Sequence, residues 1–281
     1  MKKLFTIAAF LLLCGMFISS TMNAQDSYKL VYKFQKGKTY RYATTTAGNM
    51  TQEMMGKEMK MSNGANMTVR AVVDDVLKNG DMVLVLSLDS AIVSSKSQMM
   101  DTTMNMTDLV GKRNKFVISP IGTVLSREVI DSVSTKGQFS GNVQRNLSNF
   151  SKLPEKEVKM GETWKSITLD TIDMMGGKVR HTAALDLTLK GKEKKQGHDC
   201  LKIDYTGVTA DTGKLMMNGM ELYLEGNGKV KGTLYFDVQQ GLAIADESTL
   251  DSEQTMAITG QQNMTIPMSQ SMKTIRTLLE K

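Results

Sequence analysis

The sequence is poor in cysteine, proline, histidine and aromatic residues. Its 281 residues include 2 Cys, 3 Pro and 2 His, and aromatic residues make up only 6%. So few cysteines exclude a disulfide-stapled scaffold, and so few prolines exclude a collagen-like or proline-rich chain. Sparse aromatics argue against a single-strand nucleic-acid binder, because such proteins stack bases on aromatic rings. The net charge of +6 is a mild excess that does not indicate nucleic acid either.

The first 24 residues have the pattern of a secretory signal peptide. Lys2 and Lys3 precede an apolar run over residues 4–18, and Ala24 supplies the small residue needed before a cleavage site. We therefore expect a mature chain that starts at Gln25 and lies in the periplasm or outside the cell.

Cys14 offers a competing interpretation, because the acylated cysteine of a bacterial lipoprotein also follows an apolar run. Leu13 stands where Gly, Ala or Ser normally precedes that cysteine, and the apolar run continues past it. We therefore do not expect a lipoprotein. Beyond residue 24, no stretch approaches the roughly 18 apolar residues of a membrane-spanning helix. Cys200 is then the remaining cysteine, and we expect a small buried hydrophobe there, with an intermolecular partner left open.

The dominant periodicity of the chain is two, which is typical of half-buried strands. Residues 82–88 place Leu84, Leu86 and Leu88 on one face, and residues 39–42 and 185–189 alternate in the same way. Glycine-containing turn signals separate such runs. Strands that follow one another through tight turns predict antiparallel pairing.

Three landmarks recur in the same order at nearly the same separation. Residues 37–40 (GKTY) match 161–164 (GETW), residues 80–88 match 197–205, and residues 116–125 match 235–244. Such self-similarity predicts two copies of one structural unit.

Between the copies, residues 127–152 place apolar side chains at the three-to-four spacing of an amphipathic helix, interrupted by Gly137 and Gly141. We therefore expect a mainly β protein of two tandem, curved antiparallel sheets, half-barrel or sandwich-like, joined by a short helical connector. The expected divisions are a signal peptide at 1–24, a first β unit at 25–126, the connector at 127–152 and a second β unit at 153–281. The apolar faces of the two units are expected to cover each other or something else.

Methionine is the outlier of the composition, with 24 residues. Three interpretations are open: filling of an irregular core, an adaptable apolar binding surface, or soft-metal binding by thioethers, for which 59–61 and 104–106 would place sulfur pairs on one side of a strand. No His or Cys accompanies either pair closely in sequence, so we expect no metal site. The main methionine groups lie at positions 50, 54, 55, 59, 61 and 67, at 99, 100, 104 and 106, and at 256, 264, 268 and 272.

Residue patterns of hydrolytic or redox chemistry are not visible in the sequence. His198 lies in an expected turn, His181 begins an expected strand, and neither has an acidic neighbour at helical spacing. No GxSxG turn is present. A site formed by two carboxylates stays open, because their separation is set by the fold. We therefore expect a non-enzymatic protein without a cofactor.

Three segments resemble an uncharacterised family of secreted bacterial proteins that is classed as a domain of unknown function. They are residues 34–40 (FQKGKTY), 153–164 (LPEKEVKMGETW) and 197–203 (GHDCLKI). The resemblance implies a cell-envelope protein with two β-rich halves and no assigned catalytic residues. At the level of architecture, the expected fold is similar to half-barrel carriers of lipoproteins or lipids in the periplasm, which is an analogy of fold only.

The leading functional hypothesis is an envelope protein that binds a hydrophobic or lipid-like molecule, or a partner segment, on a methionine-rich sheet face. The alternatives are a structural or assembly partner of outer-membrane proteins, and a hydrolase with an unrecognised carboxylate site or a His–carboxylate pair. No nucleic-acid partner is expected. The residues expected to form the binding face are Met54, Met59, Met61, Met67, Tyr40 and Trp164.

Overall fold

The computed structural model describes residues 26–54, 56–98, 101–132, 150–174, 176–217, 220–259 and 264–279. The predicted signal peptide lies outside these residues. Within the described ranges, no helix has the length and apolar character that a membrane crossing requires.

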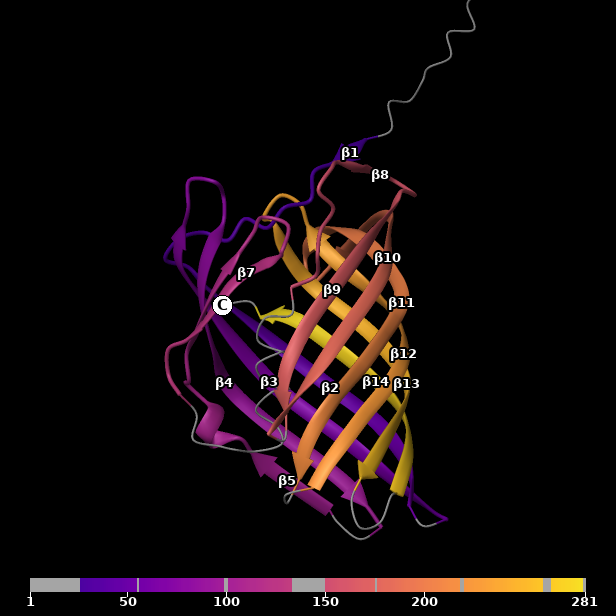
Figure 1. Cartoon of the computed structure of the whole chain (residues 1–281). Coiled ribbons are helices and arrows are strands. Elements are labelled where there is room, and N and C mark those ends of the chain that lie inside the picture. The colour runs from indigo at the N-terminus through magenta and orange to yellow at the C-terminus, as the bar shows by residue number, and fades with distance from the viewer. Residues whose placement is uncertain are drawn as a thin grey trace, which may run out of the picture.

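The described chain forms fourteen strands and one short 3-10 turn (Figure 1). The strands of the first half are β1 (Ser27–Tyr28), β2 (Thr39–Met54), β3 (Lys57–Val76), β4 (Met82–Ser97), β5 (Asp101–Asn105), β6 (Asn114–Ile118) and β7 (Val124–Val129), with the turn η2 (Thr107–Leu109) after β5. Those of the second half are β8 (Val158–Lys159), β9 (Thr163–Met174), β10 (Gly177–Lys195), β11 (His198–Met217), β12 (Met220–Asp237), β13 (Leu242–Thr259) and β14 (Met264–Leu279).

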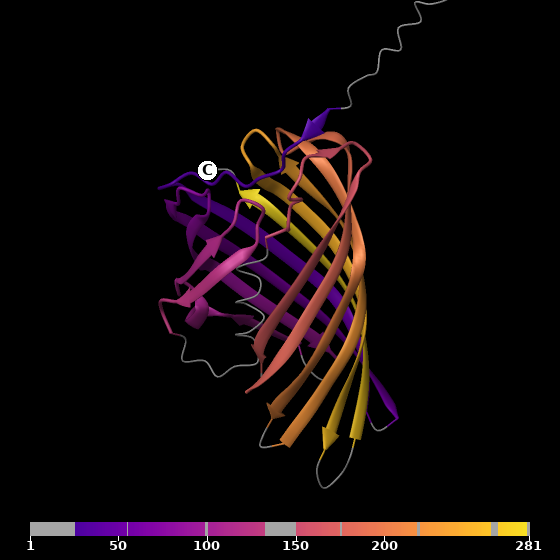
Figure 2. The ribbon, with the colours of Figure 1, turned by 45° about the horizontal axis from the view of Figure 1, so that its top comes forward.

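Twelve of these strands form one antiparallel sheet that curves strongly without closing into a barrel (Figure 2). Its order is β7-β6-β4-β3-β2-β14-β13-β12-β11-β10-β9, with β5 added beside β4. The last strand, β14, pairs with β2 along twelve residues, from Met268↔Gln52 to Leu279↔Arg41. This pairing joins the two halves of the chain, so they share a sheet instead of forming two sheets that cover each other.

The predicted helical connector is wrong at its start. Residues 127–129 belong to strand β7, where Arg127 lies opposite Phe116 of β6. Residues 130–132 and 150–152 are not helical either, and 133–149 lie outside the described residues. Val129 and Ile130 are spaced from the next apolar residues as on one face of a helix. The pairing of β7 with β6 nevertheless makes residues 127–129 a strand.

Landmarks of the predicted duplication have matching local geometry. The N–H of Gly37 donates to the carbonyl of Val73 at 2.9 Å, and that of Gly161 to the carbonyl of Leu189 at 2.7 Å. A β-bulge follows each acceptor, between Val73 and Asp75 and between Leu189 and Gly191. These are local likenesses within one continuous sheet, and the duplication itself stays a prediction.

The core lies on the inner, concave face of the sheet. As the alternation predicted, Leu84, Leu86 and Leu88 of β4 are buried on this face. The N-terminal segment crosses one end of the sheet, where Tyr32 N–H donates to the Pro120 carbonyl of the β6–β7 turn and Lys33 N–H to the Gly241 carbonyl of the β12–β13 turn. Its alternate side chains complete the core together with residues after 149: Leu30, Tyr32, Phe34, Phe150 and Leu153.

Cys200 of β11 is a buried free cysteine, which confirms the prediction of a small buried hydrophobe. Burial raises the pKa of its thiol to about 11, and the nearby Asp237 carboxylate adds to the shift. The thiol is therefore protonated and unreactive at neutral pH.

Candidate functional site

A groove lies at the rim of the sheet, where the N-terminal segment crosses its end. We call it the rim groove; its volume is about 650 Å³. Tyr40, Leu242 and Leu278 give it an apolar part, and Lys33 and Lys38 bring positive charge. The complete lining is Lys33, Gln35, Lys38, Thr39, Tyr40, His198, Gln239, Gln240, Leu242, Leu278 and Leu279.

A histidine–aspartate pair forms part of this groove. His198, predicted to lie in a turn, is the first residue of β11, and its Nδ1 is 3.0 Å from Oδ2 of Asp237 at the end of β12. Asp237 is buried, and its other oxygen accepts the Gln240 N–H at 2.9 Å. Sequence reasoning missed this pair because its members are 39 residues apart.

A second histidine–aspartate pair lies on the inner face, farther along the sheet. His181, inside β10 and not at its start, has Nδ1 2.6 Å from Oδ1 of Asp211 on β11, and Asp170 of β9 is its register partner on the other side. Arg127 of β7 reaches Asp170 at 4.0 Å, so side chains from the two edges of the sheet meet here. Within the described ranges, no group of three or more His, Cys, Asp or Glu side chains is arranged to hold a metal ion.

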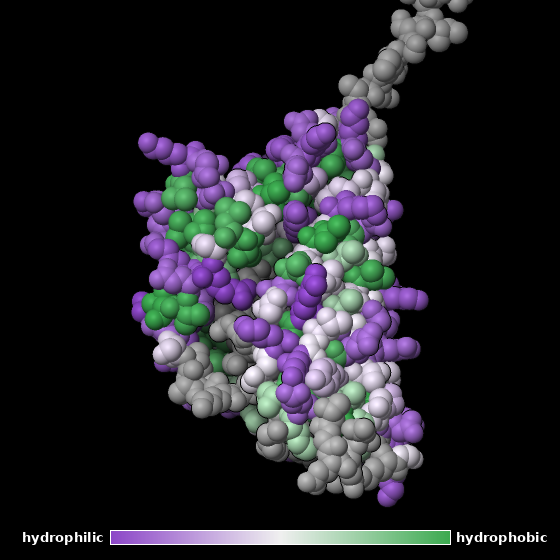
Figure 3. All heavy atoms as spheres, viewed as in Figure 1, coloured by the Kyte–Doolittle hydropathy of each residue, from purple (hydrophilic) through white to green (hydrophobic). Residues whose placement is uncertain are grey.

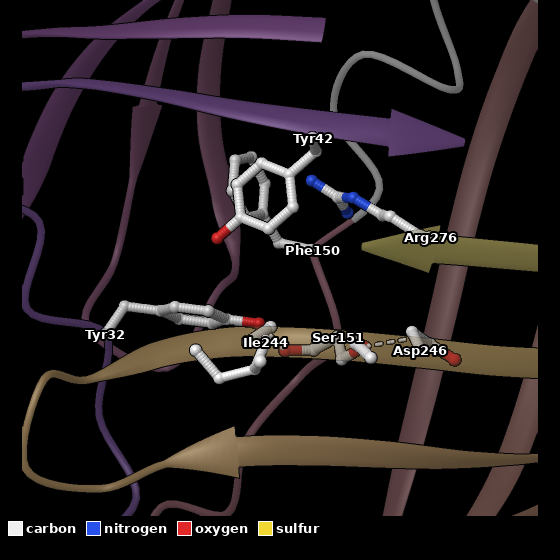
Figure 4. Close-up of a pocket in the computed structure, with 9 residues that line it drawn as sticks. Tyr32, Tyr42, Phe150, Ser151, Ile244, Asp246 and Arg276 are labelled. Carbon is white, nitrogen blue, oxygen red and sulfur yellow. Dashed lines mark hydrogen bonds between the residues drawn. The ribbon is translucent and has the colours of Figure 1, made fainter. Parts of the chain in front are cut away.

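The space between the N-terminal segment and the sheet is nearly filled. Figure 4 shows how the side chains around it lie. A remnant of about 10 Å³ lies among Tyr32, Tyr42, Phe150, Asp246 and Arg276. A space of that volume holds at most one water molecule. The inner face at this end is therefore packed core and not an open site.

A buried carboxylate is the chemical centre of this packed region. Asp246 accepts a 2.7 Å hydrogen bond from the Tyr205 hydroxyl and a 3.3 Å bond from the Ser151 hydroxyl. Arg276 is its register partner on β14, and the guanidinium stacks on the Tyr42 ring at 4.4 Å. Burial raises the pKa of Asp246, while the hydrogen bond from Tyr205 and the charge of Arg276 oppose that rise.

The raised pKa of Asp246 gives a pH-dependence of stability that can be measured. Its folded pKa lies above the ordinary value of 3.8, so its contribution to stability is complete below that value and is lost as pH rises through the folded pKa. We expect the free energy of unfolding, relative to Asp246→Asn, to fall as pH increases from 3 to 7. Urea unfolding of both proteins measures this difference, because the other carboxyls titrate in both. A difference that grows with pH would contradict the assignment.

The predicted binding residues are only partly brought together. Met59, Met61 and Met67 alternate along β3 on the inner face, and Met61 lies directly opposite Met50 of β2. The same face of the neighbouring strands β14 and β13 carries further methionines. Met67 is buried in the core, so we keep the name methionine face for the partly exposed set: Met50, Met59, Met61, Met256, Met268 and Met272.

Tyr40 and Trp164 do not join the methionine face. Tyr40 of β2 pairs with Ala71 of β3. Ala71 is twelve residues along β3 from Met59, a distance of roughly 40 Å in an extended strand. Trp164 lies on β9, at the far edge of the sheet order, and its Nε1 donates to the Lys152 carbonyl at 3.5 Å. Tyr40 lines the rim groove instead, and the side chain of Met54 lies outside the described part. Tyr40 and Met59 lie at opposite ends of the β2–β3 hairpin, and Trp164 is placed at the far edge by pairings between strands that are distant in the chain.

Comparisons with known proteins leave the family open. No family model and no curated protein matches the chain. Among solved structures, it is similar to a DUF1329 family protein from Desulfovibrio piger, with 12% identity over 85% of this chain and 84% of that chain and a TM-score of 0.18. A domain described as an outer membrane lipoprotein-sorting protein, from Vibrio parahaemolyticus, matches at 10% identity over 84% of this chain and 85% of that chain, with a TM-score of 0.13. Scores this low carry no argument about fold or function.

Proposed function

We propose that this protein is a non-enzymatic binder of a hydrophobic or lipid-like molecule in the cell envelope, and that the ligand occupies the rim groove. The volume of the groove, about 650 Å³, is the observation that carries the proposal. It falls in the range of roughly 300–1,000 Å³ that is usual for small-molecule sites. Envelope location is supported by the signal-peptide pattern of residues 1–24.

The lining of the groove suits such a ligand. Leu242 and Leu278 are largely buried and form apolar wall, while the side chain of Leu279 is 41% exposed at the end of β14. Tyr40 is positioned by edge-on packing against Phe34, with ring centroids 5.0 Å apart, and its hydroxyl accepts the Gln35 N–H. Ligand sites commonly combine such apolar walls with a few placed polar groups.

The methionine face is the second location that a hydrophobic ligand could use. Its side chains are only partly buried, and thioethers adapt to ligands of varied shape. The two locations are far enough apart along the sheet that single substitutions distinguish them.

Binding of a fluorescent naphthylamine probe, displaced by dodecanol, tests the proposal. We expect micromolar affinity, a loss of about tenfold in Leu279→Gln, and no change in the matched variant Met61→Gln, because one apolar contact contributes roughly 1–2 kcal/mol. The reverse pattern would move the ligand to the methionine face. Failure of the native protein to bind any hydrophobic probe at micromolar concentration would end the proposal.

The His198–Asp237 pair favours a hydrolase as an alternative. An imidazole that is oriented by a buried carboxylate can act as a general base. Turnover of p-nitrophenyl laurate by the native protein, abolished in His198→Gln, would support this alternative over simple binding. We expect the native protein to hydrolyse the ester no faster than the ester hydrolyses spontaneously in buffer.

An assembly partner is the remaining alternative, and the edges of the sheet favour it. β9 carries Ile167 and Leu169 with 64% and 58% exposure, and β7 carries Leu125 and Val129 with 52% each. Figure 3 shows apolar side chains over this side of the molecule. Unpaired edges can accept another strand. A stable stoichiometric partner that protects β9 amides from hydrogen exchange would support this role.

A further inference from the structure

The rim groove carries positive charge, and none of the described residues that line it is a carboxylate. Lys33 and Lys38 supply the charge, and its other residues are a histidine, amides, a threonine, a tyrosine and leucines. Two carboxylates near this rim already have partners. Asp75 pairs with Lys36 at 2.8 Å, and Asp237, behind the lining, accepts from Nδ1 of His198 at 3.0 Å. The groove is therefore complementary to a negatively charged group.

Lys33 is held in place by the β12–β13 turn. Its N–H donates to the Gly241 carbonyl at 3.0 Å, and its Nζ donates to the Val238 carbonyl at 2.9 Å. Gly241 has a φ of 67°, and a Cβ there would lie 2.5 Å from the Cβ of Lys33, so only glycine allows this close approach. An ammonium has three donors, so two N–H groups of Lys33 are left for a ligand after the bond to Val238.

His198 presents one ring nitrogen that its carboxylate partner does not use. A carboxylate only accepts, so the Nδ1 of His198 carries the hydrogen and donates to Oδ2 of Asp237 at 3.0 Å. In this neutral tautomer Nε2 holds a lone pair and only accepts, so it does not donate a hydrogen bond to an anionic group. The side-chain Nε2 of Gln240 also lies 3.2 Å from Nδ1 of His198. Asp237 is in turn held by the Gln240 N–H, so the imidazole has a fixed orientation.

From this combination we propose that the rim groove binds an amphiphile with an anionic head, a carboxylate or a phosphate carried on an alkyl chain. The head is bound by Lys33 and Lys38, with the Gln240 amide as a further donor, and the chain lies along Leu242 and Leu278. This inference rests on the proposed function of the same groove and adds the chemical class of the ligand.

Isothermal titration calorimetry of the full mature chain tests the head group. The titrants are dodecanoate, dodecyl phosphate, the uncharged dodecanol, and inorganic phosphate. The groove variant is Lys33→Gln with Lys38→Gln. Its matched control is Lys229→Gln with Lys231→Gln, which removes the same charge from exposed positions of β12.

We expect the native protein to bind dodecanoate or dodecyl phosphate at least tenfold more tightly than dodecanol, and to lose that preference in the groove variant but not in the control. A preference between the two anions identifies the head as carboxylate or phosphate. Equal affinity for dodecanol and both anions would overturn the inference and leave the proposed function standing. Inorganic phosphate bound as tightly as dodecyl phosphate would overturn it as well, because the alkyl chain would then contribute nothing to the affinity. Failure of every dodecyl compound to bind would count against the proposed function itself.

Discussion

Replacement of Gly232 by alanine should destabilise the protein by about 3 kcal/mol or more. Gly232 lies on the inner face of β12, and the ring of Tyr205 covers it. A Cβ at this position would lie 2.4 Å from the Tyr205 ring and 2.5 Å from the Glu247 carbonyl oxygen. The ring must then move, which breaks its 2.7 Å hydrogen bond to Asp246 and leaves a buried carboxylate without its strongest donor. Overpacking costs about 1–3 kcal/mol and a lost bond to a charged group about 1.5–3 kcal/mol.

Gly191→Ala is the matched control for this substitution. Gly191 also lies in a strand, but it has no positive φ and a Cβ there would meet nothing within 4 Å. We expect it to change the free energy of unfolding by less than about 1 kcal/mol, with a gain as the expected sign, because alanine restricts the unfolded chain. Chemical denaturation of both variants measures the contrast. Equal effects of the two substitutions would mean that Tyr205 does not need the space above Gly232.

Replacement of Arg276 by methionine should cost about 3–5 kcal/mol at neutral pH, because it leaves the buried Asp246 carboxylate without its positive neighbour. Arg276 and Asp246 are register partners on β14 and β13 and both border the filled space beneath Tyr32. The guanidinium also stacks on Tyr42 and Phe150, at 4.4 and 5.8 Å from the ring centroids. Methionine keeps most of this apolar contact and removes the charge, so the variant isolates the electrostatic part.

A double substitution shows whether the two charges are coupled. Adding Asp246→Asn to Arg276→Met should recover most of the lost stability, since no unpaired buried charge is then left. The loss in the single Arg276→Met variant should also shrink as pH falls and Asp246 takes up a proton. Arg113→Met, which breaks an exposed pair with Asp131, is the control and should have a small effect. An Arg276→Met effect of the same size in the native background and in the Asp246→Asn background would show that the charges do not interact.

Much of the strand structure could be predicted from local pattern. The alternation of residues 82–88 gave the correct buried face for Leu84, Leu86 and Leu88, and the glycines at 56, 80, 197 and 241 have the positive φ values that tight turns require. These features depend on neighbours within a few residues, so the sequence displays them directly. The predicted helix at 127–129 is wrong because short apolar spacings fit a helix or an edge strand, and pairing with β6 decides between them.

The candidate site could be predicted only in fragments. The sequence points to Tyr40, which does line the rim groove, but it indicates only a solvated turn for His198 and gives no signal for Lys33, Lys38 or Leu278. These residues come from both ends of the chain and from the turns between distant strands. No local signal links them, because the pairing of β11 with β12, from Leu201↔Phe236 onward, is what places the turns at 197 and 241 at the same end of the sheet.

By itself, the sequence determined that the chain is mainly β, because the alternation of apolar and polar side chains is a property of neighbouring residues. It also determined where several tight turns lie, because glycine at these positions can adopt the positive φ that such turns require. Tertiary structure alone decided that β14 pairs with β2 to make one continuous sheet, and that Asp237 lies beneath His198. Both outcomes depend on which residues face each other across strands far apart in the chain. That choice is made by the packing of the whole inner face.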